Sequence, residues 1–84
     1  MRPFMSVASF DQFSEQFAQA LEFEGALTRD TQLDTIEEYD SIGKIRLGVV
    51  IEDLFDFEVP YNVLEEKKTL GSLYEYCVEE MQRP

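Results

Sequence analysis

The residues best placed to do chemistry are Asp40 and Ser41, which directly precede an apolar stretch with helical periodicity. A serine at the start of a helix that follows a loop is exposed enough for another enzyme to reach its hydroxyl. By itself the pair is weak evidence, because Asp and Ser are also ordinary residues at a helix N-terminus. Their meaning depends on the residues that follow.

Other catalytic or metal-binding arrangements are excluded or weak. The chain has no histidine, which rules out Cys–His metal sites, Ser–His–Asp triads and Cys–His nucleophilic pairs. The acidic pairs at 37–38 and 65–66 point apart on a helix and are expected to be solvated. Asp30 and Asp34 do not continue into an EF-hand loop. We therefore expect no metal site and no catalytic activity of the chain's own.

Ser41 belongs to a longer pattern that runs without a gap from Asp40 to about Cys77. It reads D-S-I-x-x-I-x-L-x-x-x-I-E-x-x-F-x-x-E-V-P, then eight residues, then T-L-x-x-L. The residues that carry it are Asp40, Ser41, Ile42, Ile45, Leu47, Ile51, Glu52, Phe55, Glu58, Val59, Pro60, Thr69, Leu70 and Leu73. This pattern resembles the phosphopantetheine-binding carrier proteins, the family of acyl carrier and peptidyl carrier proteins.

The resemblance implies that Ser41 carries 4′-phosphopantetheine, transferred from coenzyme A by a separate phosphopantetheinyl transferase that recognises Asp40. A helix N-terminus favours the phosphate through its free N–H groups and its dipole. The arm would hold acyl or aminoacyl cargo as a thioester and deliver it between a loading ligase and downstream synthase or transferase enzymes. For Asp40, a capping role is an equally good and compatible interpretation.

The resemblance also implies that partners dock on an apolar strip formed by Ile42, Ile45 and Val49. For Ile42 a place in the core remains an equal alternative. Two cations, Lys44 and Arg46, interrupt the acidity that is usual in the acyl carriers of fatty acid synthesis. We therefore count both among the docking residues, with the hypothesis that they select partners with acidic rims.

The elements that must position Ser41 are helical. Ser9 and Gln12 have the spacing of a capping box, and Phe10, Phe13, Phe17, Ala20 and Leu21 follow at helical intervals, with Gly25 as the expected stop. A long loop over 26–39 should be held by Leu33, Ile36 and Tyr39. A second helix should run from Asp40 or Ser41 to Phe55, with Leu47, Val50, Ile51, Leu54 and Phe55 inward.

The rest of the chain completes a small bundle. A short segment over 61–68 has Val63 and Leu64 as anchors, and Thr69 should cap a last helix. The core stripe of that helix comprises Leu70, Leu73, Tyr74, Cys77 and Met81. Cys77 is therefore expected to be a buried structural thiol. The prediction is an all-α fold, a four-helix bundle of three main helices and one short helix, similar to acyl carrier protein.

Length and charge narrow the function further. With 84 residues the chain fits one domain, 1–84, in which we expect residues 1–8 to be flexible. A net charge of −11 disfavours nucleic acid, and no apolar run is long enough to insert into a membrane. We expect a stand-alone, cytoplasmic, monomeric carrier of a dedicated lipid or secondary-metabolite pathway. The alternative is a non-catalytic acidic adaptor with a carrier-like fold.

Overall fold

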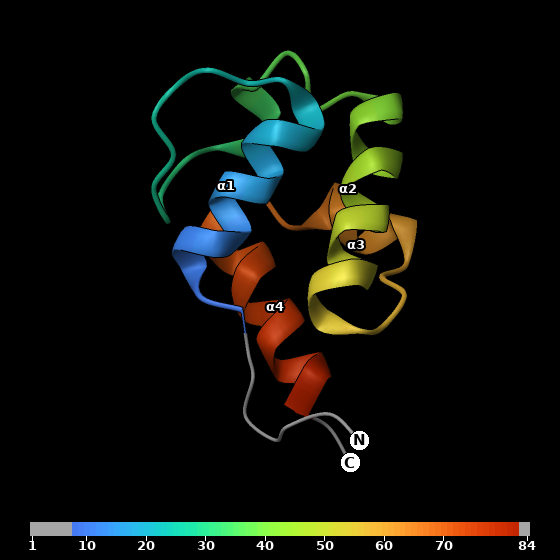
Figure 1. Ribbon diagram of the computed structural model, residues 1–84. Helices are drawn as coiled ribbons and strands as arrows, with labels where there is room; N and C mark the ends of the chain where they lie inside the picture. Colours follow the sequence, from blue (N-terminus) through green and yellow to red (C-terminus); the bar gives the residue numbers. More distant parts are fainter. Residues whose placement is uncertain (1–7, 83–84) are drawn as a thin grey trace.

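The computed structural model describes residues 8–82, which form a small helical bundle (Figure 1). Its elements are α1 (Phe10–Leu21), a 3₁₀ turn η1 (Leu33–Thr35), α2 (Ser41–Phe55), α3 (Tyr61–Glu66) and α4 (Leu70–Gln82). Over these residues the only strand-like pairing is one antiparallel bridge between Gln32 and Thr69. The predicted all-α bundle with three main helices and one short helix is confirmed.

Helix α1 begins where the sequence predicts and ends earlier. Ser9 and Gln12 form the reciprocal capping box, with N–H to side-chain distances of 3.0 and 3.1 Å. The expected stop at Gly25 is wrong, because Glu22 already adopts the left-handed conformation (φ 55°). Its N–H bonds the carbonyls of Ala18 and Gln19, which closes the last turn three residues before the glycine.

The connection over 22–40 is tied to the bundle through its middle and its C-terminal part. Leu33, Ile36 and Tyr39 are buried, as predicted. Backbone bonds join the connection to the start of α4, from the Leu70 N–H to the Thr31 carbonyl (3.0 Å) and from the Gly71 N–H to the Arg29 carbonyl (2.9 Å). The loop that leads to Ser41 is therefore held in place although it contains little regular structure.

Helix α2 buries one face and leaves another open. Leu47, Ile51 and Phe55 are fully buried, whereas Val50 and Leu54, which were expected to point inward, are only half-buried. In the core the Phe13 ring lies 5.9 Å from Phe55 and 5.6 Å from Tyr74, centroid to centroid. Aromatic packing thus joins α1, α2 and α4.

The last two helices also follow the prediction. Val63 and Leu64 on α3 are buried. Before α4, Thr69 and Ser72 bond each other's backbone N–H through their hydroxyls at 3.3 and 3.2 Å, which caps the helix. Leu70, Leu73 and Cys77 are fully buried, and Tyr74 and Met81 are half-buried.

The described part of the chain begins at Ala8. Residues 1–7, part of the segment expected to be flexible, lie outside the described residues. Ala8, the last residue of that segment, is buried, and its carbonyl accepts a 2.7 Å bond from the Tyr74 hydroxyl. Between residues 8 and 82, no helix has the length and apolar character needed to cross a bilayer.

Candidate functional site

Ser41 is the first residue of α2 and is exposed. The Gly43 and Lys44 N–H groups bond to Asp40, whereas those of Ser41 and Ile42 have no acceptor within residues 8–82. A helix N-terminus with unpaired donors favours an anion. The residues present therefore fit a phosphate-linked group on the Ser41 hydroxyl.

Asp40 is the N-cap of α2. Its side-chain Oδ1 accepts the Gly43 N–H at 2.9 Å, and its carbonyl accepts the Lys44 N–H at 2.8 Å. The capping interpretation of Asp40 is confirmed. Its other carboxylate oxygen remains available at the exposed surface, so the cap is compatible with recognition by an enzyme.

Gly43 fits a close contact between α2 and the preceding loop. A Cβ at this position would lie 2.1 Å from the carbonyl oxygen of Glu38 and 3.5 Å from the Asp40 side chain. Only glycine leaves room for this backbone approach. Gly43 is a site residue that the sequence pattern did not predict, although a glycine in the first turn of a helix is compatible with close packing.

Tyr39 anchors the loop directly before Asp40. Its hydroxyl donates a 2.7 Å bond to the Leu64 carbonyl oxygen, and its ring stacks on Phe17 at 6.0 Å between centroids. Burial, reinforced by the neighbouring Tyr61 and Cys77, raises the pKa of Tyr39 far above its ordinary range. The hydroxyl therefore stays protonated and serves as a permanent donor.

The two cations predicted as one docking feature lie on different flanks of α2. Side chains two residues apart on a helix point about 200° apart. The Lys44 ammonium lies 5.2 Å from the centre of the Tyr39 ring, on the side of α3. Arg46 is exposed and lines a separate hollow of about 280 Å³, together with Glu22 and Glu38. The structure does not bring Lys44 and Arg46 together into one basic patch.

The apolar strip, defined as Ile42, Ile45 and Val49, is exposed. Their exposed fractions are 63%, 61% and 59%. The core alternative for Ile42 is therefore wrong. Large apolar side chains that lie together and exposed on one face of a helix are typical of an interaction surface.

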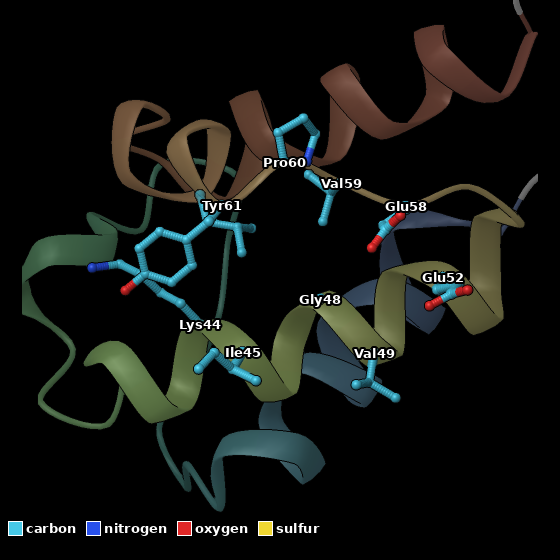
Figure 2. Close-up of a pocket in the computed structure, with 10 residues that line it drawn as sticks. Lys44, Ile45, Gly48, Val49, Glu52, Glu58, Val59, Pro60 and Tyr61 are labelled. Atoms are coloured by element: carbon cyan, nitrogen blue, oxygen red, sulfur yellow. The ribbon is translucent and has the colours of Figure 1, made fainter.

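A groove of about 570 Å³ separates α2 from α3 (Figure 2). Its lining residues are Lys44, Ile45, Gly48, Val49, Glu52, Glu58, Val59, Pro60, Tyr61 and Leu64. Figure 2 shows Lys44 and Tyr61 toward one end and Glu52 and Glu58 toward the other. Helical spacing could have grouped Lys44, Gly48 and Glu52, but only the fold supplies the opposite wall.

The described part of the chain has neither a cluster of metal ligands nor an accessible thiol. Residues 8–82 contain no group of three or more side chains that could hold a metal ion. Cys77 is fully buried, and this burial raises the pKa of its thiol to about 12. Because the thiolate is the reactive form, Cys77 is the inert structural residue that the sequence predicts.

Ser41, Asp40 and the apolar strip thus lie together on the first three turns of α2, beside the groove. Comparisons with protein-family models, curated proteins and solved structures found no match to this chain.

Proposed function

We propose that the protein is a carrier that holds acyl or aminoacyl intermediates on a 4′-phosphopantetheine arm attached to Ser41. The observation that supports this best is the position of Ser41: an exposed hydroxyl at the start of α2, behind the capping Asp40 and beside an exposed apolar strip. In this proposal the protein has no catalytic activity of its own and acts as a cytoplasmic monomer.

In the attachment reaction the chain would supply only the Ser41 hydroxyl. The Ser41 oxygen forms a bond to the phosphorus of coenzyme A that bears the pantetheine, and the P–O bond to the adenosine bisphosphate breaks. The hydroxyl proton goes to a base of the transferase, so no histidine is needed here. When attached, the arm supplies a terminal thiol that holds the cargo as a thioester. The carrier contributes by raising the effective concentration of this cargo near each enzyme.

The docking surface proposed for the transferase, the loading ligase and the downstream enzymes is the strip of Ile42, Ile45 and Val49. Exposed acidic residues lie beside it on α2, among them Glu52 and Asp53. An apolar strip next to carboxylates fits enzymes that present an apolar patch with a basic rim. Arg46 on one flank and Lys44 on the other would modify this preference separately.

The test is intact-mass spectrometry after incubation with coenzyme A, Mg²⁺ and a promiscuous phosphopantetheinyl transferase. The expected result is a mass gain of one phosphopantetheine that is absent in Ser41→Ala. Ser14→Ala serves as a matched control and should load normally, because Ser14 lies in α1 and its hydroxyl bonds only the Asp11 carbonyl of the same helix. No mass gain with transferases that load a reference carrier would refute the proposal.

The second candidate is a non-catalytic adaptor that binds a partner through the same exposed strip. The exposure of Ile42, Ile45 and Val49 is the observation that favours it, since docking alone needs no cofactor. An adaptor would keep its partner affinity in Ser41→Ala and would gain no mass with any transferase.

A further inference from the structure

The groove between α2 and α3 extends along α2 from Lys44 to Glu52. Lys44, Gly48 and Glu52 are spaced by four residues and so present one face of α2 to it. A Cβ on Gly48 would meet no atom within 4 Å, so the glycine leaves the middle of the groove open. Ile45 and Val49 give the α2 wall of the groove an apolar surface.

The two ends of the groove carry opposite charge. Lys44 lies at the end toward Ser41, one helical turn away from it, with its ammonium over the Tyr39 ring. Glu52 and Glu58 lie toward the other end (Figure 2). Within residues 8–82, neither of these two carboxylates has an ion-pair partner. A ligand in this groove is therefore complementary when it is anionic near Ser41 and cationic at its far end.

The distance along α2 matches the reach of the proposed arm. Glu52 follows Ser41 by eleven positions, which is about 16.5 Å at the helical rise. An arm of about 15 bonds, extended like a peptide at about 1.2 Å per bond, spans about 18 Å. The phosphodiester, being bonded to Ser41, would lie near Lys44, and an arm extended along the groove would bring its cargo to the end lined by Glu52 and Glu58.

We infer that the cargo is an acyl group bearing an amine, of the aminoacyl class, and that Glu52 and Glu58 receive its ammonium group. This inference rests on the proposed function and selects among its cargoes. A simple alkanoyl chain would bring apolar atoms to two carboxylates without a partner. A dicarboxylic half-ester would add a like charge there, which is unfavourable. Of the three cargo types, only the amine complements both ends of the groove.

The experiment compares three cargoes of similar size on the whole chain. The transferase installs coenzyme A analogues whose cargo is joined through a stable amide: 4-aminobutanoyl, pentanoyl and succinyl. Backbone amide NMR shifts of Gly48, Val49, Glu52 and Glu58, together with the thermal midpoint Tm, are recorded at low salt. We expect the 4-aminobutanoyl form to shift these amides most and to melt about 2 °C or more above the pentanoyl form, with the succinyl form lowest.

Two double variants serve as the matched pair. Glu52→Gln with Glu58→Gln should abolish the Tm difference among the three cargoes. Glu15→Gln with Glu65→Gln changes the net charge equally at exposed positions outside the groove, and should keep the difference. Added salt should reduce the difference in the unsubstituted protein, since both carboxylates are exposed to solvent.

The outcomes separate the inference from the proposed function. If all three cargoes load but shift the groove amides equally, or if pentanoyl shifts them most, the cargo inference is wrong and the carrier function stands. If the groove amides respond only to a bound transferase and never to cargo, the groove belongs to a protein partner and the inference is again wrong. If none of the three loads on Ser41, the proposed function fails and the inference fails with it.

Discussion

The Tyr39 hydroxyl donates a 2.7 Å hydrogen bond to the carbonyl oxygen of Leu64, 25 residues further along the chain. This bond joins the loop that ends at Asp40 to α3, on the far wall of the groove. The start of α2 and the groove beside it are therefore positioned by the same buried side chain. Residues near this contact should affect stability and Ser41 accessibility to different extents, and variants can separate the two.

Tyr39→Phe removes the hydroxyl and keeps the ring on Phe17. The Leu64 carbonyl then loses a buried partner, and the free energy of unfolding should fall by about 1–2 kcal/mol in urea or guanidinium titrations. Tyr61→Phe is the control, since the Tyr61 side chain is exposed and no hydrogen bond ties it to the described fold. Equal stability of the two variants would show that the Tyr39 bond contributes nothing.

Gly43→Ala places a methyl group against the Glu38 carbonyl. Because the added Cβ would lie 2.1 Å from that oxygen, the loop must move, at a cost of about 1–3 kcal/mol. We also expect slower loading of Ser41 by a transferase. Gly48→Ala is the matched control: its Cβ enters open space, so it should stabilise α2 by about 0.5–1 kcal/mol. The prediction fails if both glycines respond alike in equilibrium unfolding.

Ile45→Asp tests the apolar strip without disturbing the core. Ile45 is 61% exposed, so the free energy of unfolding should change by about 0.5 kcal/mol or less. Under the proposed function, kcat/KM of the transferase for this variant should fall at least tenfold, while circular dichroism remains unchanged. Leu47→Ala, two residues away but fully buried, should instead cost about 2–5 kcal/mol of stability. Unchanged loading of Ile45→Asp would remove Ile45 from the docking surface.

Stability should fall at alkaline pH because of Cys77. The thiol ionises near its ordinary pKa of 9.0 in the unfolded chain and near a pKa of about 12 in the folded one, because burial disfavours the thiolate. The unfolded state therefore loses its proton first. The stability that the protonated Cys77 thiol contributes is complete below pH 9. It decreases as the pH rises toward 12, by up to about 1.4 kcal/mol per pH unit.

Denaturant titrations at successive pH values measure this slope. Tyr39, whose pKa burial also raises, adds to the loss only above its ordinary value of 10.0. Cys77→Ala should therefore flatten the dependence between pH 9 and 10 and retain part of it above. If Cys77→Ala and the unsubstituted protein show the same slope from pH 9 to 10, the thiol is not the responsible group.

Local signals in the sequence determined the helices and their order. The Ser9–Gln12 capping box, the periodic phenylalanines of α1 and the Asp40 cap act between residues close in the chain, so their geometry follows from spacing alone. The same holds for the exposure of Ile45 and Val49, which lie on the face of α2 opposite to its buried stripe. The end of α1 at Leu21 is less predictable, because the left-handed Glu22 that follows it has no sequence signature comparable to glycine.

Only the tertiary structure decided the relationships across elements. The Tyr39–Leu64 bond, the approach of the Glu38 carbonyl to Gly43 and the groove with Lys44 at one end and Glu52 and Glu58 at the other join segments that no periodicity connects. The separation of Lys44 from Arg46 follows from helical rotation, but their surroundings depend on which elements pack on each flank. Spacing in the sequence places side chains on a face; what that face meets is determined by packing of the whole chain.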